Sequence, residues 1–199
     1  MSRKGRLHAL LPGLLIALFL LAAVEWSLSV PPYEAPDETG HARYVDFLRL
    51  HRRLPLAGEE APGEAHQPPL YYALAALAAG AAGLPALDAA PRKNPSFVWY
   101  GGSDQAKYLH DDSETPPLAG SAAGLHWLRF LSVLMAAPAV WLFHRIAAAG
   151  AGAAGPAPIA AAGLAAFLPQ FTFISGSLNN DNLANLLSAG CFALLAAVV

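Results

Sequence analysis

Cysteine and charge are both scarce in this sequence of 199 residues, and each shortage excludes a class of protein. Cys191 is the only cysteine, so an internal disulfide is impossible and a cysteine-based metal site is not expected. Charged residues make up 13% of the chain, against roughly 25% in soluble domains. The formal net charge of −2 gives no electrostatic basis for binding nucleic acid. With 55% hydrophobic residues, the composition indicates an all-α integral membrane protein.

The first long apolar run, residues 7–30, is expected to cross the membrane. Its 24 residues would reach about 36 Å as a helix, more than the roughly 30 Å hydrocarbon core. The basic residues within 1–6 place the N-terminus in the cytoplasm. A cleavable signal peptide is the alternative, but the run is longer than a signal sequence needs and more apolar segments follow. We therefore favour an uncleaved span.

Three further spans are predicted, at residues 125–143, 156–174 and 183–199, which gives a polytopic helix bundle. His144 and Arg145 suit a cytoplasmic end for the second span, followed by a short flexible turn. Because the sequence stops inside an apolar run, we expect the N-terminal piece of a longer membrane protein or a truncated gene product.

The long polar connection, residues 31–124, holds 12 of the 14 acidic and 7 of the 12 basic residues, and it is expected to be extracytoplasmic. Within it, residues 41–53 suit an amphipathic helix with Tyr44, Phe47, Leu48 and His51 on one face, which would lie on the membrane surface. Residues 70–87 are uncharged, yet their glycines and Pro85 weaken a straight helix. We interpret them as an interfacial helix, with a further span as the alternative.

Two adjacent carboxylates, Asp37 and Glu38, follow the first span and precede the amphipathic helix. Asp37 is in position to be the helix N-cap, with Glu38 in the first turn offsetting the helix dipole. The alternative is a carboxylate that acts as a general base at the membrane surface. The two interpretations are compatible, because a helix start also fixes the position of its side chain.

A second polar cluster, "EAHQPPLYY", contains His66, Gln67 and the tyrosine pair that begins at Tyr71. Its two prolines fix an extended lead-in to the next helix. Loop solvation and helix capping explain these polar residues without a function. Contact with a phosphate or a sugar is the functional alternative, and the sequence leaves both open.

A third polar cluster, "NNDN", separates the last two apolar runs and contains Asn180 and Asp181. Polar groups between membrane helices are functional-site candidates, although an Asx turn that caps the last helix explains them equally well. Arg129, near the outer end of its span, is expected to pair with Glu25 or to reach lipid headgroups. The acidic residues at 111, 112 and 114 lack metal-ligand spacing and indicate a solvated loop.

Four short motifs follow one another in a distinctive order. They are "PDExxH" (Asp37, Glu38, His41) after a first span, then "HQPPLYY", a span opening "LRFLSVL", and "PxFxFxSGSxNNDxLAN". This order resembles the start of the GT-C glycosyltransferases, in particular the bacterial relatives of protein O-mannosyltransferases and of the aminoarabinose transferase of lipid A. The resemblance covers nearly the whole chain, but only the N-terminal portion of such an enzyme.

The resemblance implies transfer of a sugar from a polyprenyl-phosphate donor to an acceptor on the extracytoplasmic face, usually with inversion. It implies that Asp37 is the base, that Glu38 assists it and that His66 and Gln67 lie near the donor phosphate. Close relatives have a lysine before the proline pair and this chain does not, so a protonated His66 or Arg129 would neutralise the phosphate. No cofactor is firmly predicted, and a divalent cation is left open.

The resulting expectation is a multi-pass protein of the bacterial inner membrane, with the acceptor (lipid, glycan or protein) unidentified. Two other classes stay open. A polytopic transporter or flippase of lipid-linked sugars would also place polar groups between its spans. A truncated, non-catalytic membrane protein would need no intact carboxylate.

Overall fold

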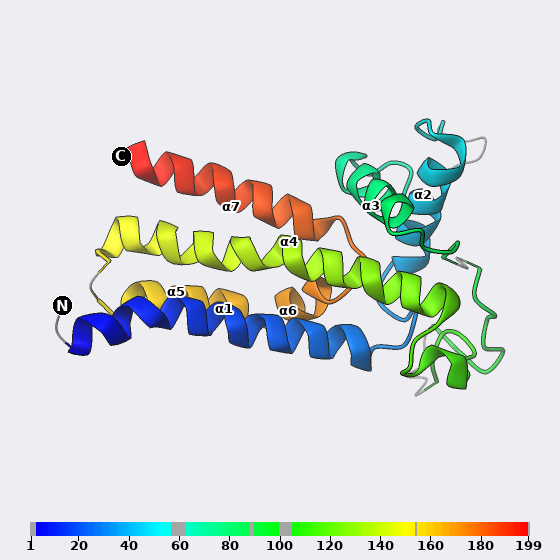
Figure 1. Ribbon diagram of the computed structural model, residues 1–199, viewed down its shortest axis with the longest axis horizontal. Coiled ribbons are helices and arrows are strands. Elements are labelled where there is room, and N and C mark those ends of the chain that lie inside the picture. The colour runs from blue at the N-terminus through cyan, green and yellow to red at the C-terminus, as the bar shows by residue number, and fades with distance from the viewer. Residues whose placement is uncertain (1–2, 57–62, 88–89, 100–104, 154, 199) are drawn as a thin grey trace. The chain divides into compact units, whose positions relative to one another are not determined.

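The computed structural model describes residues 3–56, 63–87, 90–99, 105–153 and 155–198, and this part of the chain is helical without a strand. The element order is α1 (Arg3–Ser29), α2 (Glu38–His51), α3 (Leu70–Ala81), the short 3₁₀ helix η1 (Asp112–Glu114), α4 (Gly120–Ala151), α5 (Ala157–Ala166), α6 (Pro169–Ser175) and α7 (Asp181–Val198) (Figure 1). The predicted all-α class is confirmed for the described residues.

Three of the described helices are long and apolar enough to cross a membrane: α1 over Leu10–Ser29, α4 and α7. A fourth is added if the bent pair α5 and α6 is counted as one span. These helices correspond to the four predicted spans. The helical part of α1 also begins earlier than predicted, at Arg3, so most of the segment 1–6 continues the helix.

The second span is much longer than the predicted 125–143. Helix α4 runs for 32 residues and passes through His144 and Arg145, where we expected an end. The reason is the alanine-rich stretch that follows, because alanine is the strongest helix former. The helix ends where Gly152 takes a left-handed φ of 83°, a conformation that glycine adopts without strain.

The third span is not one straight helix, which corrects the prediction for residues 156–174. Helices α5 and α6 are bent by 62° relative to each other. Pro169 is the physical cause, because it lacks the backbone N–H that would continue α5, and it disfavours helical geometry at the residue before it. Leu168 is accordingly extended, with φ −61° and ψ 118°.

The described chain divides into two compact units, and the first contains residues 1–27, 130–177 and 181–199. Its buried core joins α1, the later part of α4 and α5 through Phe19, Ala23, Val133, Ala136, Val140 and Ala166. Gly176, directly after α6, allows a close approach to α1: an added Cβ would lie 2.5 Å from the Ala23 carbonyl oxygen.

The second unit contains residues 28–129 and 178–180, and its centre is the pair of helices α2 and α3. The Tyr44 and Tyr72 rings stack with centroids 4.1 Å apart, and Tyr71 meets Tyr72 edge-on at 5.4 Å. Tyr44 and Phe47, which we expected on a membrane-facing side of α2, are buried. This part of the face is therefore covered by protein, with Tyr72 of α3 stacked on Tyr44, whereas His51 at the end of the same face is exposed.

Helix α3 is too short to be a straight span. Its 12 residues give about 18 Å of helix, well under the thickness of the hydrocarbon core. Gly83 then takes a left-handed φ of 63°, and Pro85 follows. This agrees with the interpretation of 70–87 as a non-spanning helix, while its position at the interface stays a prediction.

Candidate functional site

Asp37 lies at the N-terminal end of α2 and is exposed. Its backbone is left-handed, with φ 56°, and its side chain makes no capping hydrogen bond. The prediction that its carboxylate caps the helix is therefore wrong, although Asp37 does occupy the N-cap position. A left-handed backbone is uncommon for a residue other than glycine, and such conformations concentrate at functional sites.

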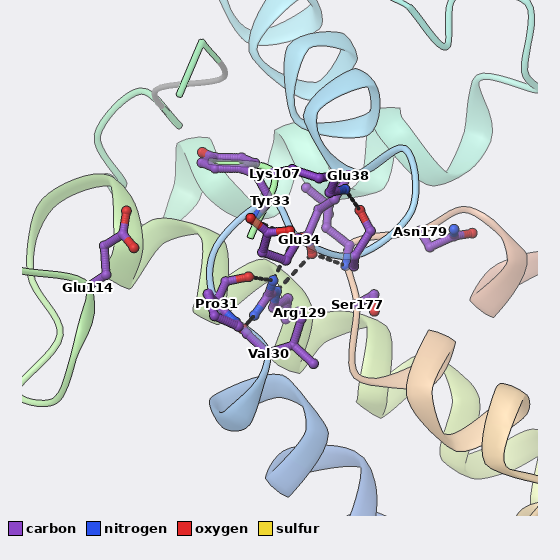
Figure 2. Close-up of polar contacts among 12 residues, drawn as sticks. Val30, Pro31, Tyr33, Glu34, Glu38, Lys107, Glu114, Arg129, Ser177 and Asn179 are labelled. Atoms are coloured by element: carbon purple, nitrogen blue, oxygen red, sulfur yellow. Dashed lines mark hydrogen bonds and ion pairs between the residues drawn. The ribbon is translucent and has the colours of Figure 1, made fainter. Parts of the chain in front are cut away.

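The neighbouring Glu38 is completely buried and bound on both carboxylate oxygens. The Arg129 guanidinium donates through Nε to Oε1 at 2.8 Å and through Nη2 to Oε2 at 2.6 Å, as Figure 2 shows. Two backbone N–H groups complete the set: Leu178 donates to Oε1 at 3.0 Å and Tyr33 donates to Oε2 at 2.9 Å. Glu38 thus ties three separate segments of the chain together.

Arg129 is the other half of this buried ion pair, and its side chain is also fully buried. Besides Glu38, its guanidinium donates to the carbonyl oxygens of Val30 at 2.7 Å and Pro31 at 3.1 Å (Figure 2). The expected partner was Glu25 or a headgroup, and the structure instead gives it Glu38. Because its donors are directed at the protein, Arg129 is a poor candidate for neutralising a donor phosphate.

Burial alone would raise the pKa of the Glu38 carboxyl, since it disfavours the charged form. The charge and hydrogen bonds of Arg129, with the two backbone N–H donors, outweigh burial and hold the pKa below its usual range. Glu38 is therefore ionised at neutral pH and neutralised by Arg129. It suits positioning of the 31–37 segment rather than proton transfer.

A buried aromatic cluster of His41, Tyr71 and Tyr72 packs between α2 and α3. His41 Nδ1 and the Tyr72 hydroxyl lie 2.8 Å apart, and both residues are buried. The Tyr71 hydroxyl accepts a hydrogen bond from the Asn179 backbone N–H at 3.1 Å. His41 and Tyr71, both predicted to bind substrate, thus lie in the core that positions the site.

His66, Gln67 and Asn180 come together, as predicted for a polar cluster. Asn180 donates through Nδ2 to Gln67 Oε1 at 3.4 Å, and the Gln67 amide nitrogen lies 3.3 Å from His66 Nε2. His66 is exposed, while Gln67 and Asn180 are half-buried. Asp181 is exposed and is the first residue of α7, which belongs to the first unit.

One ionisable cluster was missed at the level of sequence: Glu34, His110 and Glu114. His110 Nε2 lies 3.0 Å from Glu34 Oε1, and His110 Nδ1 lies 2.5 Å from Glu114 Oε2. The Tyr108 N–H also donates to Glu34 Oε1 at 2.9 Å, and Lys107 Nζ donates to the Ala35 carbonyl at 3.3 Å. The strap formed by residues 107–114 is therefore fastened to the segment that leads into Asp37.

The two carboxylates determine the protonation of His110. Burial would lower the pKa of the imidazole, but hydrogen bonds and charge from Glu34 and Glu114 raise it above its usual value. The acidic residues 111, 112 and 114 do not form a metal site in the part of the chain that the structure describes. Asp111 instead accepts the Ser113 N–H at 3.0 Å at the start of η1, as a loop residue would.

The site therefore contains two carboxylates in different environments. Glu38 is buried, ionised and saturated by donors, whereas the exposed Asp37 carboxylate is not committed to its helix cap. Comparison with known proteins adds no assignment: no family model, no curated protein and no solved structure matches the chain.

Proposed function

We propose that this chain is a membrane glycosyltransferase of the GT-C type, or the N-terminal portion of one, with Asp37 as its general base. The observation that carries the proposal is the exposed, left-handed Asp37 beside a buried and neutralised Glu38. Motif order in the sequence supplies the reaction class, and apolar helices long enough to span a membrane are compatible with a lipid-linked donor.

In the proposed reaction, Asp37 accepts the proton of an acceptor hydroxyl as that oxygen bonds to the anomeric carbon of the sugar. The bond between the anomeric carbon and the phosphate oxygen breaks, and polyprenyl phosphate leaves with the bonding electron pair. A general base of this kind contributes roughly 10²- to 10⁴-fold to the rate. The base must be accessible to the acceptor hydroxyl, and Asp37 is exposed whereas Glu38 is buried.

The leaving phosphate needs hydrogen-bond donors or a positive charge. His66, Gln67 and Asn180 form the polar cluster assigned to this task, because it combines an imidazole with two amide groups. The Glu64 carboxylate lies beside it, 3.3 Å from Gln67 Nε2 and 3.9 Å from His66 Nε2. Arg129 is assigned to positioning, since Glu38 and two backbone carbonyls bind its guanidinium. Phosphate recognition in this proposal therefore rests on His66 rather than on Arg129.

The test is sugar transfer from a radiolabelled polyprenyl-phosphate sugar by the chain reconstituted in liposomes that contain bacterial envelope acceptors. Asp37→Asn should lower the rate at least 10²-fold. Asparagine tolerates the left-handed backbone, so this variant should fold normally. Asp112→Asn, which removes another exposed carboxylate, is the matched control and should keep full activity. Near-normal transfer by Asp37→Asn would remove Asp37 as the base.

One observation favours a second candidate, a transporter of lipid-linked sugars. Discontinuous helices such as α5 and α6, with a 62° bend, form substrate sites in many transporters. A transporter would move the labelled lipid between leaflets without breaking its sugar–phosphate bond. Leaflet exchange with an intact donor, unchanged in Asp37→Asn, would favour this alternative over the transferase.

A further inference from the structure

The cluster of Glu34, His110 and Glu114 takes no part in the proposed reaction. His110 lies between the two carboxylates, with Nε2 at 3.0 Å from Glu34 Oε1 and Nδ1 at 2.5 Å from Glu114 Oε2. Glu34 belongs to the segment before α2, whereas Glu114 lies in η1 (Figure 2). The three side chains are between 15% and 25% exposed, so solvent screens their charges only in part.

His110 can donate to both carboxylates only when it carries a proton. The imidazolium has an N–H on each ring nitrogen, whereas the neutral ring has one N–H and one lone pair. A neutral His110 would therefore turn a lone pair toward one of the two carboxylates. Burial lowers the pKa of His110, but hydrogen bonds and charge from Glu34 and Glu114 outweigh burial and raise the pKa above its ordinary value of 6.5.

Other charged groups lie on the 107–114 strap and on residues 92–94, which pair with it. Asp111, next to His110 in the sequence, is exposed and pairs with Arg92 at 3.8 Å. Lys107 donates to a backbone carbonyl of the segment before α2, and Lys93 is exposed. Glu34 and Glu114, which contact the imidazole directly, therefore dominate its protonation.

The strap is fastened to the residues that come just before Asp37. The Tyr108 N–H donates to Glu34 Oε1 at 2.9 Å, and a lysine of the strap donates to the Ala35 carbonyl at 3.3 Å. The carbonyls that Arg129 binds lie earlier in the same segment. The strap thus holds the part of the segment that is nearest to Asp37.

We propose that His110 is a positioning residue and a pH-dependent latch: its imidazolium joins Glu34 to Glu114 and thereby holds the 31–37 segment, with Asp37 at its end. When His110 loses its proton, one carboxylate is released and the strap loosens from the segment. The latch itself does not depend on sugar transfer. Its effect on the rate of transfer rests on the proposed role of Asp37.

The test is hydrogen exchange of the full chain in liposomes from pH 6 to pH 9, read by mass spectrometry as protection relative to the unfolded chain. Peptides that cover 31–37 and 107–114 should lose protection by about tenfold as the pH rises, because a charged hydrogen bond is lost. His110→Gln should give low protection at every pH. Glu114→Gln should move the midpoint to lower pH, because one of the two carboxylates that favour the imidazolium is gone.

The matched control is His51→Gln, which removes an exposed histidine at the end of α2 and should keep the native profile. Constant protection from pH 6 to pH 9, or the native fall in protection in His110→Gln, would overturn the latch. Loosening confined to the 107–114 peptides would also overturn it, because the 31–37 segment would then be held without His110.

Sugar transfer measured as kcat at saturating donor separates the latch from phosphate binding by His66. The native kcat should fall over the pH range in which both segments lose protection, and His110→Gln should lack this fall. A kcat that stays constant while both segments loosen would overturn the positioning role. Loss of protection as expected, in a chain that transfers no sugar at any pH, would support the latch and contradict the proposed function.

Discussion

The buried ion pair between Glu38 and Arg129 leads to a quantitative prediction about stability. Replacing Glu38 with glutamine removes the negative charge and leaves the Arg129 guanidinium buried beside a neutral amide. Both side chains are fully buried, so solvent does not screen the loss. Breaking one partner of such a pair costs about 3–5 kcal/mol.

The expected change in melting temperature follows from the size of the chain. For 150–250 residues, 1 kcal/mol corresponds to about 2–4 °C, so Glu38→Gln should lower the melting temperature by roughly 10 °C. The measurement is thermal unfolding in detergent. Arg92→Gln is the control, because Arg92 pairs with Asp111 at 3.8 Å on the surface, and exposed pairs contribute about 0–1 kcal/mol.

The double variant Glu38→Leu/Arg129→Met tests whether the loss of stability comes from leaving one buried charge unpaired. Removing both charges should recover much of the loss, because apolar side chains of similar volume avoid the unpaired charge. The recovery should be incomplete, since the N–H groups of Tyr33 and Leu178 lose their acceptor. A shift below 2 °C for Glu38→Gln, or a double variant as unstable as the sum of its single variants, would refute the reasoning.

Three further predictions follow from the same structure. The pKa of His110 is raised in the folded chain, so its ion pairs stabilise the 107–114 strap fully below pH of about 6.5 and lose this effect as the pH rises through the raised pKa. Limited proteolysis at Lys107 should therefore speed up between pH 6 and pH 9. The variant His110→Gln should remove that pH dependence. Gly176→Ala should lower stability by roughly 1–3 kcal/mol in thermal unfolding, because its Cβ would overlap the Ala23 carbonyl. Tyr72→Phe leaves His41 without the tyrosine hydroxyl and should cost about 1–3 kcal/mol by the same measurement, whereas the exposed Trp99→Phe should cost nothing measurable.

The sequence predicted the long apolar helices well, because a run such as residues 7–30 specifies a helix through its own composition. It predicted α2 and α3 for the same reason, and α2 begins at Glu38, directly after the expected N-cap residue Asp37. The apolar composition of residues 156–174 predicts one continuous helix and does not reveal the bend. Pro169 is the sequence signal for the bend, because a proline disfavours helical geometry at the residue before it.

Partners across long sequence separations were not predictable in this way. Glu38 and Arg129 are 91 residues apart, and a single sequence does not indicate which buried charge will meet which. The same holds for His110 and Glu34, which are 76 residues apart. Local periodicity places a residue on a helix face, whereas pairing depends on how the connecting segments pack.

The adjacent carboxylates show why the difference between local pattern and long-range pairing matters for the site. Asp37 and Glu38 have the same chemistry, and the sequence offers no physical reason to divide their roles. The left-handed backbone at Asp37 comes directly before the first helical residue, where Asp37 is exposed and Glu38 is buried against Arg129. Arg129 binds the Glu38 carboxylate inside the protein, and the Asp37 carboxylate is left at the surface, where a substrate can reach it. Removing the Arg129 side chain should therefore disturb the position of Asp37 through the backbone. Arg129→Lys should disturb it too, because lysine cannot form the bidentate ion pair with Glu38.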